Sequence, residues 1–213
     1  MEWGGRAVTR VFRPGFVEKT QRTSVVKHYG LKTLLYGTLL PGPDIGRGCA
    51  REMRAVRAAG FEVGIHCWDH VRWQDNVATA DAAWTEREMV RATSRVQAIF
   101  GEEAKTWGAA GWQTNRHAAW FEEGRYGYAS DTRGFCPFVP LWDGVRIGCA
   151  QLPTTLPTFD ELIGRDGIDE QNVADALLEK TAERRAVHVF TAHAELEGGH
   201  FLRAFEWLLA GWV

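Results

Sequence analysis

The stretch FEVGIHCWDH, residues 61–70, contains the feature on which the predicted fold depends. Its largely apolar first half, Phe61–Ile65, is typical of a short buried strand, and this strand ends directly at His66. In parallel α/β folds the carboxyl ends of the strands carry the functional residues. A second histidine, His70, follows four residues later. The stretch therefore predicts a parallel α/β fold with a site at the end of this strand.

The sequence on either side alternates between helix-like and strand-like segments. Helices are expected at residues 8–28, 51–59, 79–100, 116–123, 169–185 and 201–209, and strands at residues 106–110, 126–130, 146–152 and 187–191. A loop rich in Gly and Pro is expected at residues 37–48, and the helix over residues 79–100 is expected to start with a Thr79 cap and stop at Gly101. This alternation predicts a mostly parallel sheet or barrel covered by helices. Because the pattern opens and closes on a helix, a barrel of these elements is expected to be open on one side.

Composition narrows the class of protein. The 213 residues are enough for one sizeable domain, 1–213, and 45% hydrophobic with 24% charged residues is normal for a globular chain. A formal net charge of -2 gives no argument for nucleic acid as a partner. No stretch approaches the roughly 20 apolar residues of a transmembrane segment, and no apolar leader follows Met1, so a cytoplasmic protein is expected. The apolar, aromatic residues 205–213 are interpreted either as a contact with a membrane surface or partner, or as a core helix.

The two histidines of residues 61–70 form a candidate metal site. Imidazoles four residues apart, one at a strand end and one in the following turn, can converge on a single metal ion. Asp69 is a candidate acceptor for the second N–H of one of these histidines. The alternative, that the H-x-x-x-H spacing arises by chance on an ordinary surface, stays open on spacing alone.

A second candidate site lies in VHVFTAHAE, residues 187–195. His193 follows the predicted strand, and imidazole is the usual proton donor near neutral pH. His188 lies inside that strand and is interpreted as a packed core histidine. Glu195 and Glu197 are interpreted as solvated loop residues in preference to catalytic carboxylates.

Two further turns carry candidate residues. The small residues of Gly108–Trp112 either let a ligand approach the backbone closely or simply make a tight turn. Asp131 lies at a strand end in SDTRG, residues 130–134. It is a candidate to orient His193 or to pair with Arg133, and an ordinary turn salt bridge is the alternative.

The longer motifs resemble a known family. The strings HCWDHVRWQ, AAGW, SDTRG, AQLPTTLPTFDELIGRD and TAHAELEG follow one another in the order used by the polysaccharide deacetylase (NodB-homology) family. Within that family they are most similar to the deformylases of undecaprenyl-phosphate-linked 4-deoxy-4-formamido-L-arabinose, which serve lipid A modification and polymyxin resistance. The resemblance runs from about Arg6 to Trp207.

The resemblance implies a distorted (β/α) barrel that holds a divalent metal, most often zinc. It implies that His66 and His70 bind the metal, that His193 is the general acid, and that Asp131 orients it. In the family an aspartate on the first strand completes the metal site, beside a second aspartate that is the general base, whereas the first aspartate of this sequence is Asp44. The fold is therefore expected to be incomplete, without its first and last strands. The metal site is expected to lack its aspartate ligand, and the general base is expected to be absent.

The resemblance also implies a partner and a place in the cell. The substrate would be the lipid-linked sugar, met by a cytoplasmic protein on the inner face of the inner membrane. Substrate-binding candidates are Trp68, Arg72, Gly111, Trp112 and Arg133, and Arg165 is a further candidate for the substrate phosphate. The alternative functions are a pseudoenzyme and a non-catalytic binder of the lipid-linked sugar.

Overall fold

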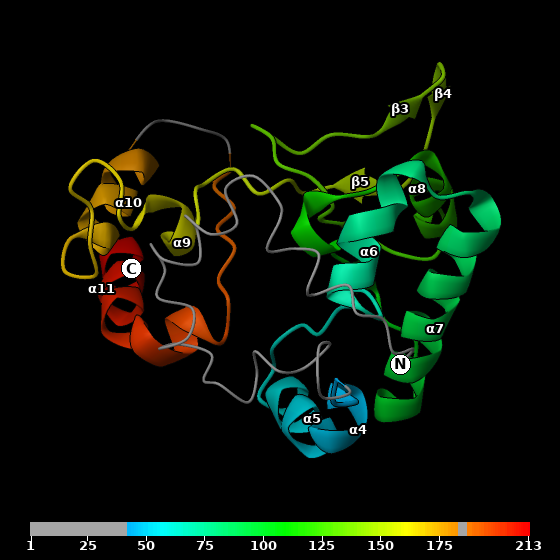
Figure 1. Ribbon diagram of the computed structural model, residues 1–213, viewed down its shortest axis with the longest axis horizontal. Helices are drawn as coiled ribbons and strands as arrows, with labels where there is room; N and C mark the ends of the chain where they lie inside the picture. Colours follow the sequence, from blue (N-terminus) through cyan, green and yellow to red (C-terminus); the bar gives the residue numbers. More distant parts are fainter. Residues whose placement is uncertain (1–41, 183–186) are drawn as a thin grey trace. The chain divides into compact units, whose positions relative to one another are not determined.

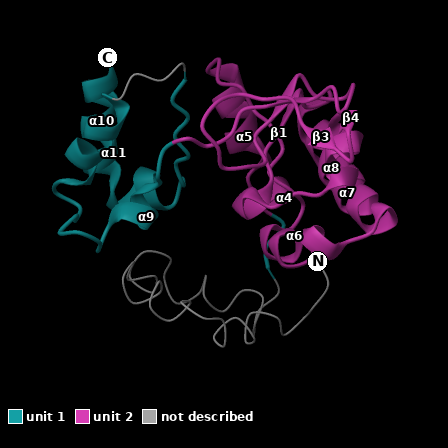
Figure 2. Cartoon of the chain, turned by 90° about the horizontal axis from the view of Figure 1, so that it is seen from above, with its two compact units in different colours: residues 1–44, 156–213 teal, residues 45–155 magenta. Residues whose placement is uncertain are grey.

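The computed structural model describes residues 42–182 and 187–213. The described chain falls into two compact units, residues 45–155 and the stretch from Leu156 to Val213 (Figure 2). Each unit has a hydrophobic core of its own. The helix expected over residues 8–28 and the beginning of the loop expected over residues 37–48 lie outside the described residues. The single domain 1–213 stays a prediction.

Three short parallel strands form the main sheet of unit 45–155 (Figure 1). They are β1 (Thr106–Trp107), β2 (Tyr128–Ala129) and β5 (Ala150–Gln151), which neighbour one another in that order. Each lies within a segment that the sequence predicts as a strand. The parallel pairing confirms the predicted α/β class, although the strands are shorter than their apolar segments.

The segment before His66 joins this sheet at one residue. Ile65 bridges Trp107 in parallel, its amide donates to the Thr106 carbonyl at 3.0 Å, and its own carbonyl accepts from the Gly108 amide at 2.8 Å. The expected buried strand Phe61–Ile65 is therefore wrong in extent, since Phe61 is 67% exposed and only Ile65 is buried. The backbones approach closely here, because a Cβ on Gly64 would lie 2.4 Å from the Thr106 hydroxyl.

The strand expected over residues 146–152 is divided in two. Its first part belongs to β4 (Val145–Arg146), which pairs antiparallel with β3 (Leu141–Trp142). Asp143 and Gly144 connect the two strands with φ of 50° and 79°, the left-handed conformations of a type I′ hairpin turn. An Asp-Gly pair favours this turn, so the chain reverses before β5 begins.

Helices make up much of the rest of this unit. They include α4 (Ile45–Gly48), α5 (Ala50–Ala58), α6 (His70–Asn76), α7 (Ala82–Phe100) and α8 (Arg116–Glu122). The loop expected as far as residue 48 thus ends in a short helix.

The long helix α7 ends where the sequence predicts but begins later than predicted. The helix ends at Gly101, with φ of 76°, as the sequence predicts. Its cap is Asp81, whose carboxylate accepts from the Trp84 amide at 2.8 Å, and the Thr79 cap is wrong. Thr79 instead ends a 3₁₀ turn, Val77–Thr79, that precedes the helix.

Aromatic rings fill the core of this unit. Trp73 and Trp107 are 1% and 2% exposed, and their ring centroids lie 5.6 Å apart. Trp107 also stacks on Tyr126, at 6.0 Å. The buried indole N–H of Trp73 donates to the Gln113 carbonyl at 2.7 Å. Core packing, the common use of tryptophan, thus accounts for these two residues.

The unit from Leu156 onward is helical. It contains α9 (Phe159–Leu162), α10 (Val173–Thr181), a π-helical turn over Leu196–His200 and α11 (Leu202–Trp212). The helices α10 and α11 pack side by side through buried residues that include Leu177 and Leu208 (Figure 1).

The strand expected over residues 187–191 is wrong. These residues form no strand, and the Val189 carbonyl accepts from the Leu156 amide at 3.1 Å. His188 within it is half-buried, so it is not the fully packed core residue that the sequence predicts.

Asn115 ties three elements of unit 45–155 together. Its side-chain amide donates to the Val77 carbonyl at 2.8 Å and to the Thr85 hydroxyl at 3.0 Å, and its oxygen caps α8 by accepting from the Ala118 amide at 2.9 Å. Asn115→Ala removes these bonds at a buried position and is expected to lower the free energy of unfolding by roughly 2–3 kcal/mol. Urea denaturation measures the change. Glu86→Ala, at an exposed position of α7, is the control, and equal losses for the two variants would contradict the prediction.

Candidate active site

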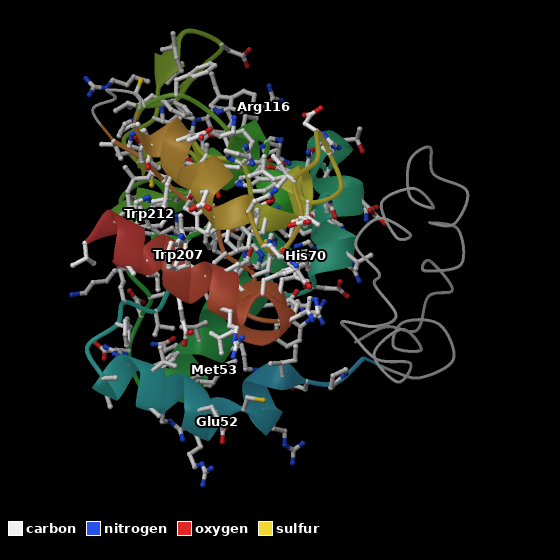
Figure 3. All side chains as sticks on the ribbon, turned by 90° about the vertical axis from the view of Figure 1, so that its left-hand side faces the viewer. Glu52, Met53, His70, Arg116, Trp207 and Trp212 are labelled. Carbon is white, nitrogen blue, oxygen red and sulfur yellow. The ribbon has the colours of Figure 1, made fainter. Side chains whose placement is uncertain are left out.

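The two histidines of the predicted metal site lie side by side. His66 follows Ile65 at the carboxyl end of the parallel sheet, and His70 begins α6. Their ring centroids are 5.3 Å apart with an interplanar angle of 60°. Both residues are exposed. Figure 3 labels His70 among the surrounding side chains. The four-residue spacing therefore brings the two imidazoles together, while metal binding itself stays a prediction.

A backbone contact fixes the His66 ring. Its Nδ1 lies 2.8 Å from the Gly108 carbonyl oxygen. Because a carbonyl oxygen only accepts, Nδ1 carries the hydrogen of the neutral ring and Nε2 keeps a free lone pair. Metal-binding histidines characteristically hold their second N–H in this way. The residues thus fit one half of a divalent metal site.

A third ligand is not found in the described parts of the chain, where no three His, Cys, Asp or Glu residues cluster closely enough to hold a metal ion. Cys67 lies between the histidines, but burial raises the pKa of its thiol far above the ordinary value, and its sulfur accepts from the Ala110 amide. Asp69 is predicted to support a histidine, and its observed contact is the cap of α6, from the Arg72 amide at 3.0 Å.

A pair of buried carboxyl groups lies under the turn that holds His66. Asp131 is fully buried and accepts from the Ala109 amide at 2.9 Å, next to the Gly108 carbonyl. Glu122, also fully buried, hydrogen-bonds with Asp131, and the Gln151 amide donates to both, at 2.9 Å to Asp131 and 3.3 Å to Glu122. One sequence interpretation made Asp131 part of an ordinary turn salt bridge. Its burial contradicts that interpretation. Its predicted role in orienting His193 stays a prediction.

These two carboxyl groups share a proton. Burial raises the pKa of Glu122 well above its ordinary value, and the neighbouring Asp131 raises it further. Burial also raises the pKa of Asp131, whereas its hydrogen bonds from Glu122, Gln151 and the Ala109 amide lower it. We place the proton on Glu122, since these donors favour the charged form of Asp131. No sequence pattern singles out Glu122, which lies in the helix expected over residues 116–123.

The turn of small residues at 108–112 packs closely against neighbouring side chains. Gly111 and Trp112 have φ of 62° and 54°, and a Cβ on Gly111 would lie 2.6 Å from the Gln74 side-chain nitrogen. The Trp112 indole donates to the Thr154 hydroxyl at 2.9 Å, and the Arg133 guanidinium lies 4.7 Å from its ring centre. The tight-turn interpretation therefore holds at Gly111. Arg133 and Trp112 form a cation–aromatic pair.

The other predicted substrate contacts are engaged within the protein. Arg91 and Arg95 place their guanidinium groups 4.8 Å and 5.3 Å from the Trp68 ring centre. Arg72 lies 3.5 Å from the carboxylate of Glu88, which is buried. Trp68 thus stacks on cations, and Arg72 contributes to a buried ion pair.

His193 belongs to the unit from Leu156 onward, where two carboxylates flank it. Its Nδ1 lies 4.0 Å from Asp160 and 4.0 Å from Glu197, and its backbone amide donates to Glu197 at 2.6 Å. Glu197 is 1% exposed, so its interpretation as a solvated loop residue is wrong, whereas Glu195 is exposed as expected. The four-residue spacing of His193 and Glu197, the same as that of His66 and His70, favours the other alternative for Glu197, a carboxylate beside the site.

The chain is similar in sequence to known proteins, among them the following two. A protein of Shewanella sediminis (strain HAW-EB3), named "Probable 4-deoxy-4-formamido-L-arabinose-phosphoundecaprenol deformylase ArnD", is 36% identical over 208 residues, which cover 96% of this chain and 66% of that protein. A protein of the same name from Wigglesworthia glossinidia brevipalpis is 32% identical over 205 residues, covering 95% and 71%. The chain thus spans about two thirds of the length of these relatives. No family model matches it.

A solved structure shows the same fold. The crystal structure of a "probable Polysaccharide deacetylase" from Pseudomonas aeruginosa PAO1 matches with a TM-score of 0.59 at 19% identity, covering 78% of this chain and 57% of that one. This likeness places the chain in the distorted α/β fold of the polysaccharide deacetylases.

The shared proton of Glu122 and Asp131 predicts a pH-dependent stability. A carboxyl group whose pKa is raised by folding stabilises the fold below its unfolded pKa, about 4.3 for Glu, and this contribution is lost as the pH rises through the folded pKa. Glu122→Gln cannot ionise at this position. The free energy of unfolding of wild type minus that of Glu122→Gln should therefore fall between about pH 5 and pH 8.

Urea denaturation at both pH values measures this difference. The matched control is Glu86→Gln, an exposed position on α7, whose difference from wild type should stay constant. A difference for Glu122→Gln that rises with pH would show that the carboxylate is the stabilised form, contrary to the assignment.

Proposed function

Since the chain belongs to the family of the 4-deoxy-4-formamido-L-arabinose-phosphoundecaprenol deformylases, we propose that the protein hydrolyses the formamide of this lipid-linked sugar. Water would add to the formyl carbon, the C–N bond would break, and formate and the free aminosugar would leave. The observation that carries the proposal is the His66 ring, which the Gly108 carbonyl turns so that Nε2 is available beside His70. Two imidazoles in this arrangement are typical of half of a metal-hydrolase site.

His66 and His70 would hold a divalent metal, with zinc as our proposal. The metal would supply a Lewis acid for the formamide carbonyl and for water. The His66–Gly108 hydrogen bond keeps the imidazole in one orientation and one tautomer, so that no conformational freedom is lost when the ion binds. The buried Asp131 supports this through the Ala109 amide, because that bond fixes the peptide whose carbonyl holds His66.

His193 would hold the proton that the leaving amine needs. An alkylamine is a poor leaving group unless its nitrogen is protonated as the C–N bond breaks, and imidazole can supply that proton near neutral pH. The His193 side chain is 35% exposed, so its ring is accessible from one side. The carboxylates of Asp160 and Glu197 each lie 4.0 Å from its Nδ1 atom.

Arginine and tryptophan side chains would receive the rest of the substrate. Arg133 is exposed and lies over Trp112, and we propose that this cation and this ring meet the phosphate and the sugar. Trp68 would contribute indirectly, by holding the guanidinium groups of Arg91 and Arg95 that stack on its ring. Gly111 would contribute the backbone turn that carries Trp112.

The substrate is a lipid, so we propose that the protein works at the inner face of the inner membrane. No helix of the described chain is long and apolar enough to span a bilayer. The carboxyl-terminal helix α11 exposes Trp207 at 63%, Leu209 at 43% and Trp212 at 38% (Figure 3). Aromatic and aliphatic side chains of this kind support binding in the lipid headgroup region.

The histidine assignment predicts how metal binding responds to substitution. His66→Ala or His70→Ala removes one of two neighbouring imidazoles and should lower zinc affinity at least about tenfold, whereas His193→Ala should leave it unchanged. Isothermal titration calorimetry of the three variants measures this. Loss of binding in His193→Ala with binding intact in His66→Ala would show the assignment to be wrong.

The activity itself is tested by formate release from a short-chain polyprenyl-phosphate analogue of formamido-arabinose. Release should require added zinc, and His66→Ala should lower it by more than about tenfold. Binding of the analogue without formate release would favour the alternative function, a binder of the lipid-linked sugar.

A further inference from the structure

His193 and Glu197 each carry a buried polar atom, and the two atoms complement each other. Within the described parts of the chain, neither His193 Nδ1 nor the Oε1 atom of Glu197 has a hydrogen-bond partner, and both atoms are buried. Buried polar atoms are nearly always paired, so an unpaired donor beside an unpaired acceptor needs an explanation. The Nδ1 atom lies 4.0 Å from the other oxygen of the same carboxylate.

The backbone already ties this carboxylate to His193. The Oε2 atom of Glu197 accepts from the His193 amide at 2.6 Å, and the Glu197 amide in turn donates to the His193 carbonyl at 2.9 Å. These two bonds close the π-helical turn Leu196–His200 onto His193 and hold the carboxylate beside the imidazole. A small rotation of either side chain would bring Nδ1 within hydrogen-bond distance. Such bonds are often long in a free enzyme and shorten when substrate binds.

Asp160 is less available for this bond. Its Oδ1 atom, the one 4.0 Å from His193 Nδ1, already accepts from the Thr158 hydroxyl at 2.5 Å. Thr158 caps helix α9 in a capping box with Glu161, which holds Asp160 in the first turn of that helix. Asp160 therefore contributes negative charge near the ring, and Glu197 has the free acceptor atom.

We infer that Glu197 is the positioning residue of His193: it accepts the Nδ1 hydrogen and so directs Nε2 to the leaving amine. The inference rests on the proposed function, in which His193 gives its Nε2 proton to the departing nitrogen and keeps its Nδ1 hydrogen on Glu197. A carboxylate in this position both selects the tautomer and stabilises the imidazolium. Burial raises the pKa of Glu197, and the bond from the His193 amide opposes part of that rise.

The tautomer of His193 tests this without any assay of catalysis. Long-range ¹H–¹⁵N spectra of the full chain are recorded at about pH 9, where an ordinary imidazole is neutral, and the His193 signals are assigned with His193→Gln. We expect the proton on Nδ1 in wild type and in Glu197→Gln, which keeps an acceptor, and a mixture of tautomers in Glu197→Leu. Glu195→Leu, at an exposed position two residues earlier, is the matched control and should leave the signals unchanged.

The wild-type spectrum alone is decisive if Glu197→Leu does not fold. A wild-type proton on Nε2 would overturn the inference, and so would a tautomer that changes in Asp160→Asn but in neither Glu197 variant. These outcomes do not depend on deformylase activity. Absence of formate release would contradict the proposed function, whereas the spectra alone would decide whether Glu197 positions His193.

Where formate release is measurable, kinetics separate positioning from structure. Glu197→Gln keeps the tautomer and loses the charge, so kcat should fall roughly 10–100-fold with KM within about twofold. The loss should shrink for a p-nitroformanilide analogue, whose amine leaves without protonation. Equal losses for both substrates, or an unchanged kcat, would overturn the inference.

Discussion

The parallel pairing of Ile65 with Trp107 is the contact on which the candidate site depends. Two backbone hydrogen bonds, from Ile65 to Thr106 and from Gly108 to Ile65, set the register between the segment before His66 and β1. With that register the Gly108 carbonyl, one residue beyond the strand, faces the His66 ring. The site therefore needs no long strand at this position, since a single bridged residue with a buried Ile65 side chain is enough to place the histidine.

The same register makes the buried polar cluster below the site necessary. The chain leaves β1 at Gly108, so the Ala109 amide has no strand partner and Asp131 accepts from it instead. A buried carboxylate is costly unless several donors surround it, and Gln151 supplies a second one. Glu122 sits beside this charge and keeps its proton, because two carboxylates so close together in a buried site would repel each other. The polar cluster thus follows from the way the sheet ends.

The sequence was informative where a pattern is local. The strand segments, the carboxyl end of α7 at Gly101 and the adjacency of His66 and His70 all follow from apolar runs, a helix-ending glycine and residue spacing. The sequence was uninformative where tertiary contacts determine the secondary structure, the helix cap or the burial of a side chain. Residues 187–191 have the apolar composition of a strand but form none. Helix α7 is capped by Asp81 instead of Thr79. Glutamate is usually exposed, which is why the buried Glu122 and Glu197 were not predicted.

The two candidate histidines differ in what faces their Nδ1 atoms, and this difference matches the chemistry proposed for each. At His66 the neighbour is a backbone carbonyl, which accepts the Nδ1 hydrogen and leaves the Nε2 lone pair for a metal ion. At His193 the neighbours are the carboxylates of Asp160 and Glu197, each 4.0 Å from Nδ1. A carboxylate beside Nδ1 is the arrangement of a histidine that gives a proton from Nε2. The local partners are therefore those expected for the metal ligand proposed at His66 and the proton donor proposed at His193.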